Sequence, residues 1–249
     1  MNSHLLQTKL YIPPTRREYV SRSRLNAMLD EGLACKLTLL SAPAGYGKTS
    51  LLSDWSSQLQ QPCIWLSLDR YDNDPSRFLE YLITSLQNYG IEIKSQPLSQ
   101  IKSNGMLDVS TLAILINELI SYRPGFVLIL DDFHRIENDE VHRFVSYMLE
   151  NLPENITLVI ATRIDPPLQL ARLRARGVLC EIRAKELRFS EAEAIIFLNQ
   201  SMKLGLERSK AAALISKTEG WITGLQLAAI SLKDNPDQAS FIAAFAGDD

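Results

Sequence analysis

The chain has 249 residues, a net charge of −3 at pH 7 and a hydrophobic content of 46%, which is typical of a globular protein with an ample core. This weakly acidic balance gives no support to a nucleic-acid-binding surface over the whole chain. No apolar stretch is long enough to span a bilayer and the N-terminus lacks a signal peptide's apolar core, so no membrane partner is expected. The three cysteines are widely spaced, without metal-ligand spacing, which is typical of free thiols in a cytoplasmic protein.

The first part of the chain is predicted to be extended and then helical. Residues 1–20 are expected to be extended, because Pro13 and Pro14 disfavour a helix there. A short helix is predicted from Arg22 to Glu31, ending at Gly32. Apolar runs predict strands over 36–41, 63–68, 126–130, 156–162 and 179–183, and helical patterns separate most of them.

The segment after the first strand has the sequence of a phosphate-binding loop. It reads Ala42-Pro43-Ala44-Gly45-Tyr46-Gly47-Lys48-Thr49-Ser50, and Ser50 opens a helix predicted to reach Gln60. Gly45 and Gly47 let backbone N–H groups turn inward, and the helix N-terminus adds further unpaired donors. Lys48 is expected to reach the β- and γ-phosphates of a nucleotide, and the Thr49 hydroxyl to bind Mg²⁺. Ala42 replaces the usual first glycine, and the alternative is a glycine-rich turn without a ligand.

Helical patterns lie on both sides of the third predicted strand. One helix is capped by Asp74 and Pro75 and runs to Asn88. Residues 90–106 are polar and are predicted to form an exposed loop. Further helices are predicted over 108–121 and 139–150.

Two carboxylates follow the third strand directly. The apolar run over 126–130 is typical of a buried parallel strand, and Asp131 and Asp132 come after it. In an open α/β sheet the carboxyl ends of the strands form the ligand edge, so this is a Walker B pattern. Asp131 is expected to hold Mg²⁺, and Asp132 to act as a base or to position water. The alternative is a strand end followed by an acidic turn.

A polar residue and a cation end the fourth strand. Thr162 and Arg163 are candidates for sensing a γ-phosphate, because an arginine fork donates well to anionic oxygens. A solvated arginine at a strand end is an equal alternative. His134, after the acidic pair, could act as a base, although such a histidine more often only packs beside a site.

The pattern changes after residue 187. No further strand is predicted, and helices are expected over 191–201, 207–217, 221–233 and 238–246, the first opened by the capping box Ser190 to Glu193. We therefore expect a nucleotide-binding domain over 1–187 and a small helical domain over 188–249. The overall fold is predicted to be α/β, a three-layer P-loop NTPase sandwich with a mostly parallel five-stranded sheet. The final residues lack an obvious ending, which suggests a piece of a longer protein.

Several motifs together resemble one family. The chain is similar to the nucleotide-binding domain of signal-transduction ATPases with numerous domains (STAND ATPases), in particular those of large LuxR-type transcriptional activators. Besides the phosphate-binding loop, the matching segments are Thr8–Pro14, Val20–Leu25, Trp65–Asp69, Asp72–Pro75, Asp131–His134, Thr162–Arg163, Pro166–Leu168, Leu187–Phe189 and Glu219–Trp221.

The resemblance implies roles for residues outside the loop. Val20 and Arg22 resemble a strip that contacts adenine. Gly224 and Leu225 resemble a helical-domain motif that closes over the nucleotide. That motif commonly has proline at its third position, whereas this chain has Gln226.

The resemblance also implies a regulatory switch. In such proteins ADP holds a closed monomer, whereas ATP and a small-molecule inducer favour an oligomer that activates transcription. Slow Mg²⁺-dependent ATP hydrolysis is expected, and inducer and DNA would bind only through domains beyond residue 249. The alternative is a turnover P-loop ATPase, either a motor or a kinase-like enzyme. A scaffold with a vestigial site is disfavoured by Lys48, Thr49 and Asp131, and no guanine-recognition motif is present.

Overall fold

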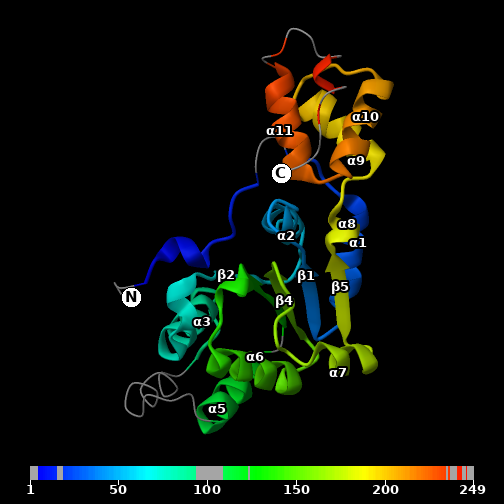
Figure 1. Cartoon of the computed structure of the whole chain (residues 1–249). Coiled ribbons are helices and arrows are strands. Elements are labelled where there is room, and N and C mark those ends of the chain that lie inside the picture. The colour runs from blue at the N-terminus through cyan, green and yellow to red at the C-terminus, as the bar shows by residue number, and fades with distance from the viewer. Residues whose placement is uncertain are drawn as a thin grey trace.

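A parallel sheet of five strands is the centre of the computed structural model (Figure 1). The structure describes residues 5–15, 19–93, 109–122, 124–233, 235, 240–242 and 245. The strands lie in the order β2-β3-β4-β1-β5. Their bounds are Leu37–Ser41 (β1), Cys63–Ser67 (β2), Phe126–Asp131 (β3), Ile156–Thr162 (β4) and Leu179–Arg183 (β5). The predicted α/β fold with a five-stranded parallel sheet is confirmed.

The register of the sheet brings the polar strand ends to one edge. Ser41 of β1 lies opposite Thr162 of β4 and Arg183 of β5, and Asp131 of β3 lies opposite Ser67 of β2. All residues of β1, β3 and β4 are buried, as expected for parallel strands with helices on both faces. The residues that follow these strands therefore meet at the carboxyl edge of the sheet.

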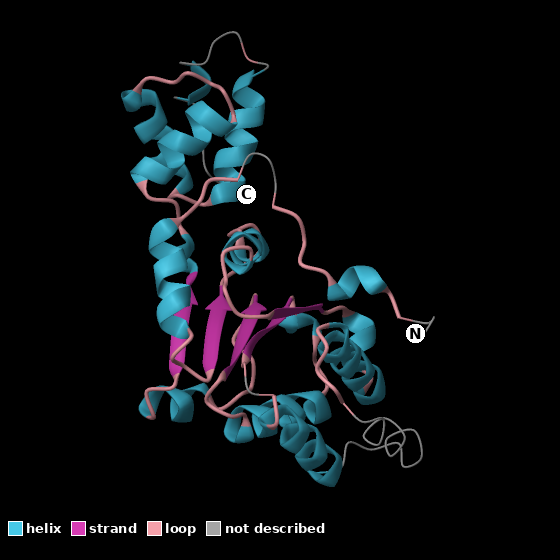
Figure 2. Cartoon of the chain, turned by 180° about the vertical axis from the view of Figure 1, so that it is seen from behind, coloured by secondary structure: helices cyan, strands magenta, loops and turns pink. Residues whose placement is uncertain are grey.

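Helices cover both faces of the sheet (Figure 2). On one face, α1 (Ser23–Gly32) and α2 (Lys48–Ser56) form an apolar core with the strands. The helices of the other face are α3 (Pro75–Asn88), α5 (Val109–Ile120), α6 (Asp139–Asn151) and α7 (Leu170–Ala175). This three-layer arrangement leaves the carboxyl edge of the sheet free to hold a site.

Most predicted helices are present, with differences at their ends. The α2 helix begins at Lys48 instead of Ser50, because Gly47, with a φ of 75°, turns the chain directly into the helix, and it ends at Ser56 instead of Gln60. The start of α3 is as predicted, since the Asp74 carboxylate accepts a hydrogen bond of 2.7 Å from the Arg77 amide. Residues 94–106 of the predicted exposed loop lie outside the described residues.

The N-terminal segment differs from the predicted extended chain. Gln7–Leu10 form a 3-10 helix, η1, that packs beside the edge strand β2. Lys9 is buried there and forms ion pairs with Asp69, at 3.1 Å, and with the fully buried Asp72. Asp69 also caps the short helix η2 (Arg70–Asn73). The extended-chain prediction missed this helix because its stability comes from contacts made 60 residues away.

A helical part follows β5. Its elements are α8 (Ala184–Leu187), α9 (Glu191–Ile196), the π-helix η4 (Phe197–Ser201), α10 (Arg208–Thr218) and α11 (Ile222–Lys233). The predicted capping box is present, since the Glu193 amide donates to the Ser190 hydroxyl and the Ser190 amide to the Glu193 carboxylate. The elements from α9 onward enclose a core of their own, to which Val20 and Phe189 also contribute, whereas α8 packs into the core of the α/β part. Of the helix predicted over 238–246, only residues 240–242 and 245 are described.

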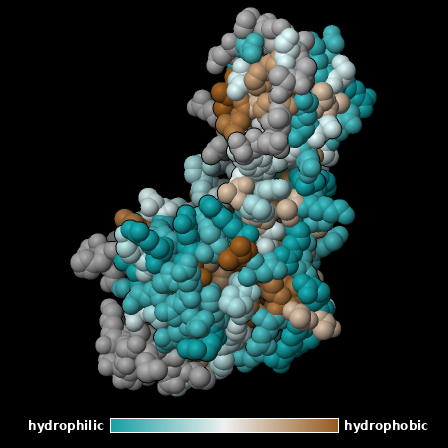
Figure 3. Space-filling view, in the orientation of Figure 1, coloured by the Kyte–Doolittle hydropathy of each residue, from teal (hydrophilic) through white to brown (hydrophobic). Residues whose placement is uncertain are grey.

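The face of the α/β part seen in Figure 3 is mostly hydrophilic, with hydrophobic residues in small groups, as expected when most apolar side chains lie in the cores. Within the described part of the chain, none of the helices combines the length and the apolar character required to cross a membrane.

Candidate nucleotide-binding site

The loop between β1 and α2 lies at the carboxyl edge of the sheet. Gly45 and Gly47 have φ angles of 80° and 75°, which side chains other than glycine rarely adopt. A Cβ atom on Gly45 would lie 2.4 Å from the Thr223 hydroxyl oxygen, so this position also has no room for a side chain. Ala42 is buried in the core beside the sheet, and Tyr46 packs partly buried against the same core. The loop is thereby fixed at both ends.

Lys48 lies along this loop. Its ammonium group donates hydrogen bonds of 2.6 Å to the Ala42 carbonyl and 2.8 Å to the Pro43 carbonyl. Burial lowers the pKa of Lys48, and the positive charge of Arg163 lowers it further. Ala42 and Pro43 therefore take part through backbone oxygens that hold the lysine in place.

A hydrogen bond joins the side chains of Thr49 and Asp131. The Thr49 hydroxyl donates a hydrogen bond of 2.9 Å to the carboxylate of Asp131, which is only 4% exposed. Burial raises the pKa of Asp131 to about 6, and the neighbouring Asp132 adds to this effect. A hydroxyl and a carboxylate suit Mg²⁺, whose remaining ligands are usually waters and phosphate oxygens. Within the described residues, no group of three or more His, Cys, Asp or Glu side chains forms a metal site.

Asp132 and Arg163 line a cavity with the loop. This sheet-edge cavity has a volume of about 240 Å³, and its other walls are Ala44, Gly45, Gly47, Lys48, Thr49 and Ser50. Asp132 has a φ of 57°, and its side chain is 46% exposed. By contrast, the Thr162 hydroxyl donates 2.7 Å to the Ile164 carbonyl, so it is engaged by the backbone. Six of the nine loop residues expected to bind the nucleotide thus line one cavity together with Arg163, whereas Ala42, Pro43 and Tyr46 do not line it.

His134 lies beside Asp132. Its Nδ1 atom is 3.8 Å from an Asp132 carboxylate oxygen, and neither ring nitrogen has a hydrogen-bond partner among the described residues. Burial lowers the pKa of His134, so the imidazole is mainly neutral at pH 7.

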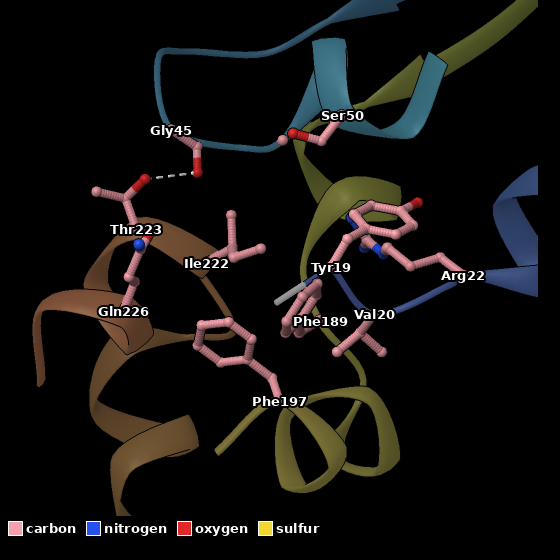
Figure 4. Close-up of a pocket in the computed structure, with 11 residues that line it drawn as sticks. Tyr19, Val20, Arg22, Gly45, Ser50, Phe189, Phe197, Ile222, Thr223 and Gln226 are labelled. Atoms are coloured by element: carbon pink, nitrogen blue, oxygen red, sulfur yellow. Dashed lines mark hydrogen bonds between the residues drawn. The ribbon is translucent and has the colours of Figure 1, made fainter. Parts of the chain in front are cut away.

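A second cavity lies on the other side of the loop. This helix-side cavity has a volume of about 160 Å³ and lies between the N-terminal strip, the loop and the helical part (Figure 4). Its apolar walls are Val20, Phe189, Phe197 and Ile222. Its polar lining comes from Tyr19, Arg22, Ser50, Thr223 and Gln226, together with the backbone of Gly45 and Gly47. A mainly apolar pocket with a few polar groups is typical of a small-molecule site.

Arg22 is mostly engaged by the chain itself. It is only 2% exposed, and its guanidinium donates 2.6 Å to the Leu187 carbonyl and 2.9 Å to the Arg188 carbonyl. It also lies over the Phe189 ring, 4.8 Å from the centroid. Burial lowers the pKa of Arg22 to about 10, so the side chain remains charged at pH 7. Arg22 therefore borders the cavity while fixing the segment that leads into the helical part.

Gly224 and Leu225 lie inside the helical part and do not line either cavity. Leu225 is fully buried, and a Cβ atom on Gly224 would lie 2.9 Å from the Trp221 ring. The cavity is instead lined by Thr223 and Gln226, which flank this pair on α11. No site role was predicted for Thr223, Phe189 or Phe197, although Phe189 ends the family-like segment Leu187–Phe189. The available signals were that segment, the motif that contains Gln226, and the four-residue spacing that places Ile222 and Gln226 on one face of a helix.

Comparisons with known proteins identify relatives of the chain and structures with the same fold. No family model matches the chain. The chain is 37% identical over 237 residues to the HTH-type transcriptional regulator MalT of Serratia proteamaculans, which covers 94% of this chain and 26% of that protein. It is also 37% identical over 229 residues to MalT of Yersinia enterocolitica, covering 91% of this chain and 25% of the relative. The chain thus spans about a quarter of the length of the curated relatives it matches.

Two solved structures with the same fold are a Walker-type ATPase and Cdc6p. The Walker-type ATPase of Pyrococcus abyssi has a TM-score of 0.58 at 16% identity, covering 93% of this chain and 73% of that one. Cdc6p of Pyrobaculum aerophilum has a TM-score of 0.51 at 18% identity, covering 92% and 65%. At this identity the likeness concerns the fold alone. The chain is therefore a homologue of the MalT-type HTH transcriptional regulators over a quarter of their length, and it has the P-loop ATPase fold.

Proposed function

We propose that this chain is the ATP- and ADP-binding switch domain of a transcriptional activator. The observation that carries the proposal is the meeting of the loop, the Thr49–Asp131 pair, Asp132 and Arg163 at one sheet edge, beside the helix-side cavity. In this arrangement phosphates lie in the sheet-edge cavity and the nucleoside lies in the helix-side cavity. The loop, which lines both cavities, joins the two halves of the ligand.

The loop residues bind and orient the phosphates. Backbone N–H groups of the loop and the N-terminus of α2 donate to the β-phosphate, and Lys48 exchanges its bonds to the loop carbonyls for bonds to the β- and γ-phosphates. Thr49 and Asp131 hold Mg²⁺, which supplies neutralisation of the phosphate charge. Asp132 orients the attacking water, and Arg163 donates to the γ-phosphate during a slow hydrolysis. Val20, Phe189 and Phe197 pack against the adenine ring. Arg22 fixes the segment before Phe189 through its hydrogen bonds to the Leu187 and Arg188 carbonyls.

The same proposal covers the organisation of the whole protein. Residues 1–187 form the nucleotide-binding domain and residues 188–249 a small helical domain, which is supported by the separate core of that part. The roles of Gly224 and Leu225 become indirect, since they pack the helix that presents Thr223 and Gln226. The names of the relatives support regulation of transcription. The proposal adds that other parts of a cytoplasmic protein bind DNA and a small-molecule inducer, and that the protein self-associates in its ATP state.

Calorimetric titration of ADP and ATP with Mg²⁺ tests the nucleotide site. Lys48→Ala is expected to raise both dissociation constants by about 100-fold, because it removes charge-assisted hydrogen bonds to phosphate. The control Lys36→Ala removes an exposed bond to the Glu150 carbonyl far from the loop and should leave both constants unchanged. Equal affinities for Lys48→Ala and the unchanged chain would contradict the site.

A further inference from the structure

A side chain of the helical part holds the phosphate-binding loop directly. The hydroxyl of Thr223, in the first turn of α11, donates a hydrogen bond of 3.0 Å to the carbonyl oxygen of Gly45 (Figure 4). The two residues are 178 positions apart in the chain. A Cβ atom on Gly45 would meet this hydroxyl at 2.4 Å and the Trp221 indole nitrogen at 2.9 Å, so only glycine permits the contact.

The geometry of the peptide unit links this contact to the next backbone N–H of the loop, that of Tyr46. The described peptide bonds are all trans, so the Gly45 carbonyl and the Tyr46 N–H point in opposite directions from one plane. The carbonyl points toward Thr223, on the side of the helix-side cavity. The Tyr46 N–H therefore points away from the helical part, and Gly45 also lines the sheet-edge cavity with Lys48 and Arg163.

We propose that Thr223 is a positioning residue that aims the Tyr46 N–H at the phosphates of the bound nucleotide. The inference rests on the proposed nucleotide-binding function and adds a mechanism for its coupling to the helical part. Without the Thr223 hydroxyl, the glycine at position 45 leaves the peptide unit free to rotate. With it, the carbonyl is fixed and the peptide is polarised, which makes the Tyr46 N–H a better donor.

The coupling acts in both directions. A phosphate that accepts from the Tyr46 N–H polarises the same peptide and strengthens the Gly45–Thr223 bond. Phosphate binding therefore holds the first turn of α11 against the loop, and displacement of α11 weakens phosphate binding. Adenosine, which lacks phosphates, does not engage this link.

Titration of ADP and adenosine against three variants tests the role of Thr223. Thr223→Val keeps the shape and removes the donor, and it should raise the Kd of ADP about threefold to tenfold while the Kd of adenosine changes less than twofold. Thr223→Ser restores the donor and should restore ADP affinity. Gln226→Ala, on the same helix and cavity, should change the Kd values of ADP and adenosine by the same factor.

Two results would overturn the role of Thr223. One is an unchanged ratio of the two Kd values in Thr223→Val, and the other is a Thr223→Ser variant that behaves like Thr223→Val. If the unchanged protein binds neither ligand, the proposed function itself fails. The amide resonance of Tyr46 in the ligand-free protein provides an independent test, because it should shift in Thr223→Val and return in Thr223→Ser, and an unchanged resonance would overturn the proposed peptide orientation.

Discussion

At the scale of single residues, the polar side chains that meet at the sheet edge could be predicted from the sequence. Lys48, Thr49 and Arg163 follow strands whose carboxyl ends must meet in a parallel sheet, and they line one cavity. Asp131, at the end of β3, joins them through its hydrogen bond with Thr49. The residues of the helix-side cavity were less accessible. Which face of α11 turns toward the loop depends on packing between distant segments, so the position of Thr223 could not be predicted, although Gln226 lies in the motif that resembles a nucleotide-closing segment.

Asp131 provides a prediction at this scale. Because burial raises its pKa to about 6, the folded metal-free protein binds a proton more tightly than the unfolded chain, and its stability falls as the pH rises from about 4 to 6. Asp131→Asn keeps an acceptor for Thr49 and removes the buried charge. It should raise the free energy of unfolding of the metal-free protein at pH 7 by about 1 kcal/mol.

Urea denaturation of the metal-free protein at pH 7 and pH 4.5 measures this effect. The gain in the free energy of unfolding should shrink at pH 4.5, where the Asp131 carboxyl is already protonated. In addition, Mg²⁺ should no longer strengthen nucleotide binding in the variant. A variant less stable than the unchanged protein at pH 7 would show that the ionised Asp131 carboxylate does not destabilise the folded protein at that pH.

At the scale of elements, the strands were predicted within one residue and the helices less exactly. Long apolar runs define buried strands well, whereas α2 begins two residues early because Gly47 adopts a left-handed conformation. The predicted helix from Glu191 changes to a π-helix at Phe197. Its packing against Phe189, at a ring distance of 5.7 Å, depends on tertiary contacts that no local pattern encodes.

Glu193 joins the elements around the segment between β5 and α9. It caps α9 with Ser190, and its carboxylate accepts hydrogen bonds of 3.0 and 3.1 Å from Arg24. It also lies 3.7 Å from the buried Arg22. Glu193→Ala should therefore lower the free energy of unfolding by about 2 kcal/mol, through loss of the cap and of charged hydrogen bonds.

The matched control is Glu191→Ala in the same helical turn. Glu191 is paired with Arg208, whose side chain is 83% exposed, so its loss should cost less than about 0.5 kcal/mol. Thermal denaturation of both variants compares the two positions. Similar losses for both would contradict a special role of Glu193 in joining the elements.

At the scale of the whole molecule, the helix-side cavity lies between the α/β part and the helical part and is lined by residues of both. The loop contacts both, through the bond of Thr49 to Asp131 of β3 on the sheet side and the bond of Thr223 to Gly45 on the helical side. A nucleotide that occupies both cavities contacts both parts at once. Retention of that ligand is what distinguishes a switch from a turnover enzyme, which must release its product.

The most direct measurement is to denature the freshly purified protein and identify any released nucleotide by chromatography. The switch account predicts close to one ADP per chain, held by the loop and the helix-side cavity together. Protein that releases no nucleotide, and that also fails to take up ADP with Mg²⁺ before denaturation, would contradict it.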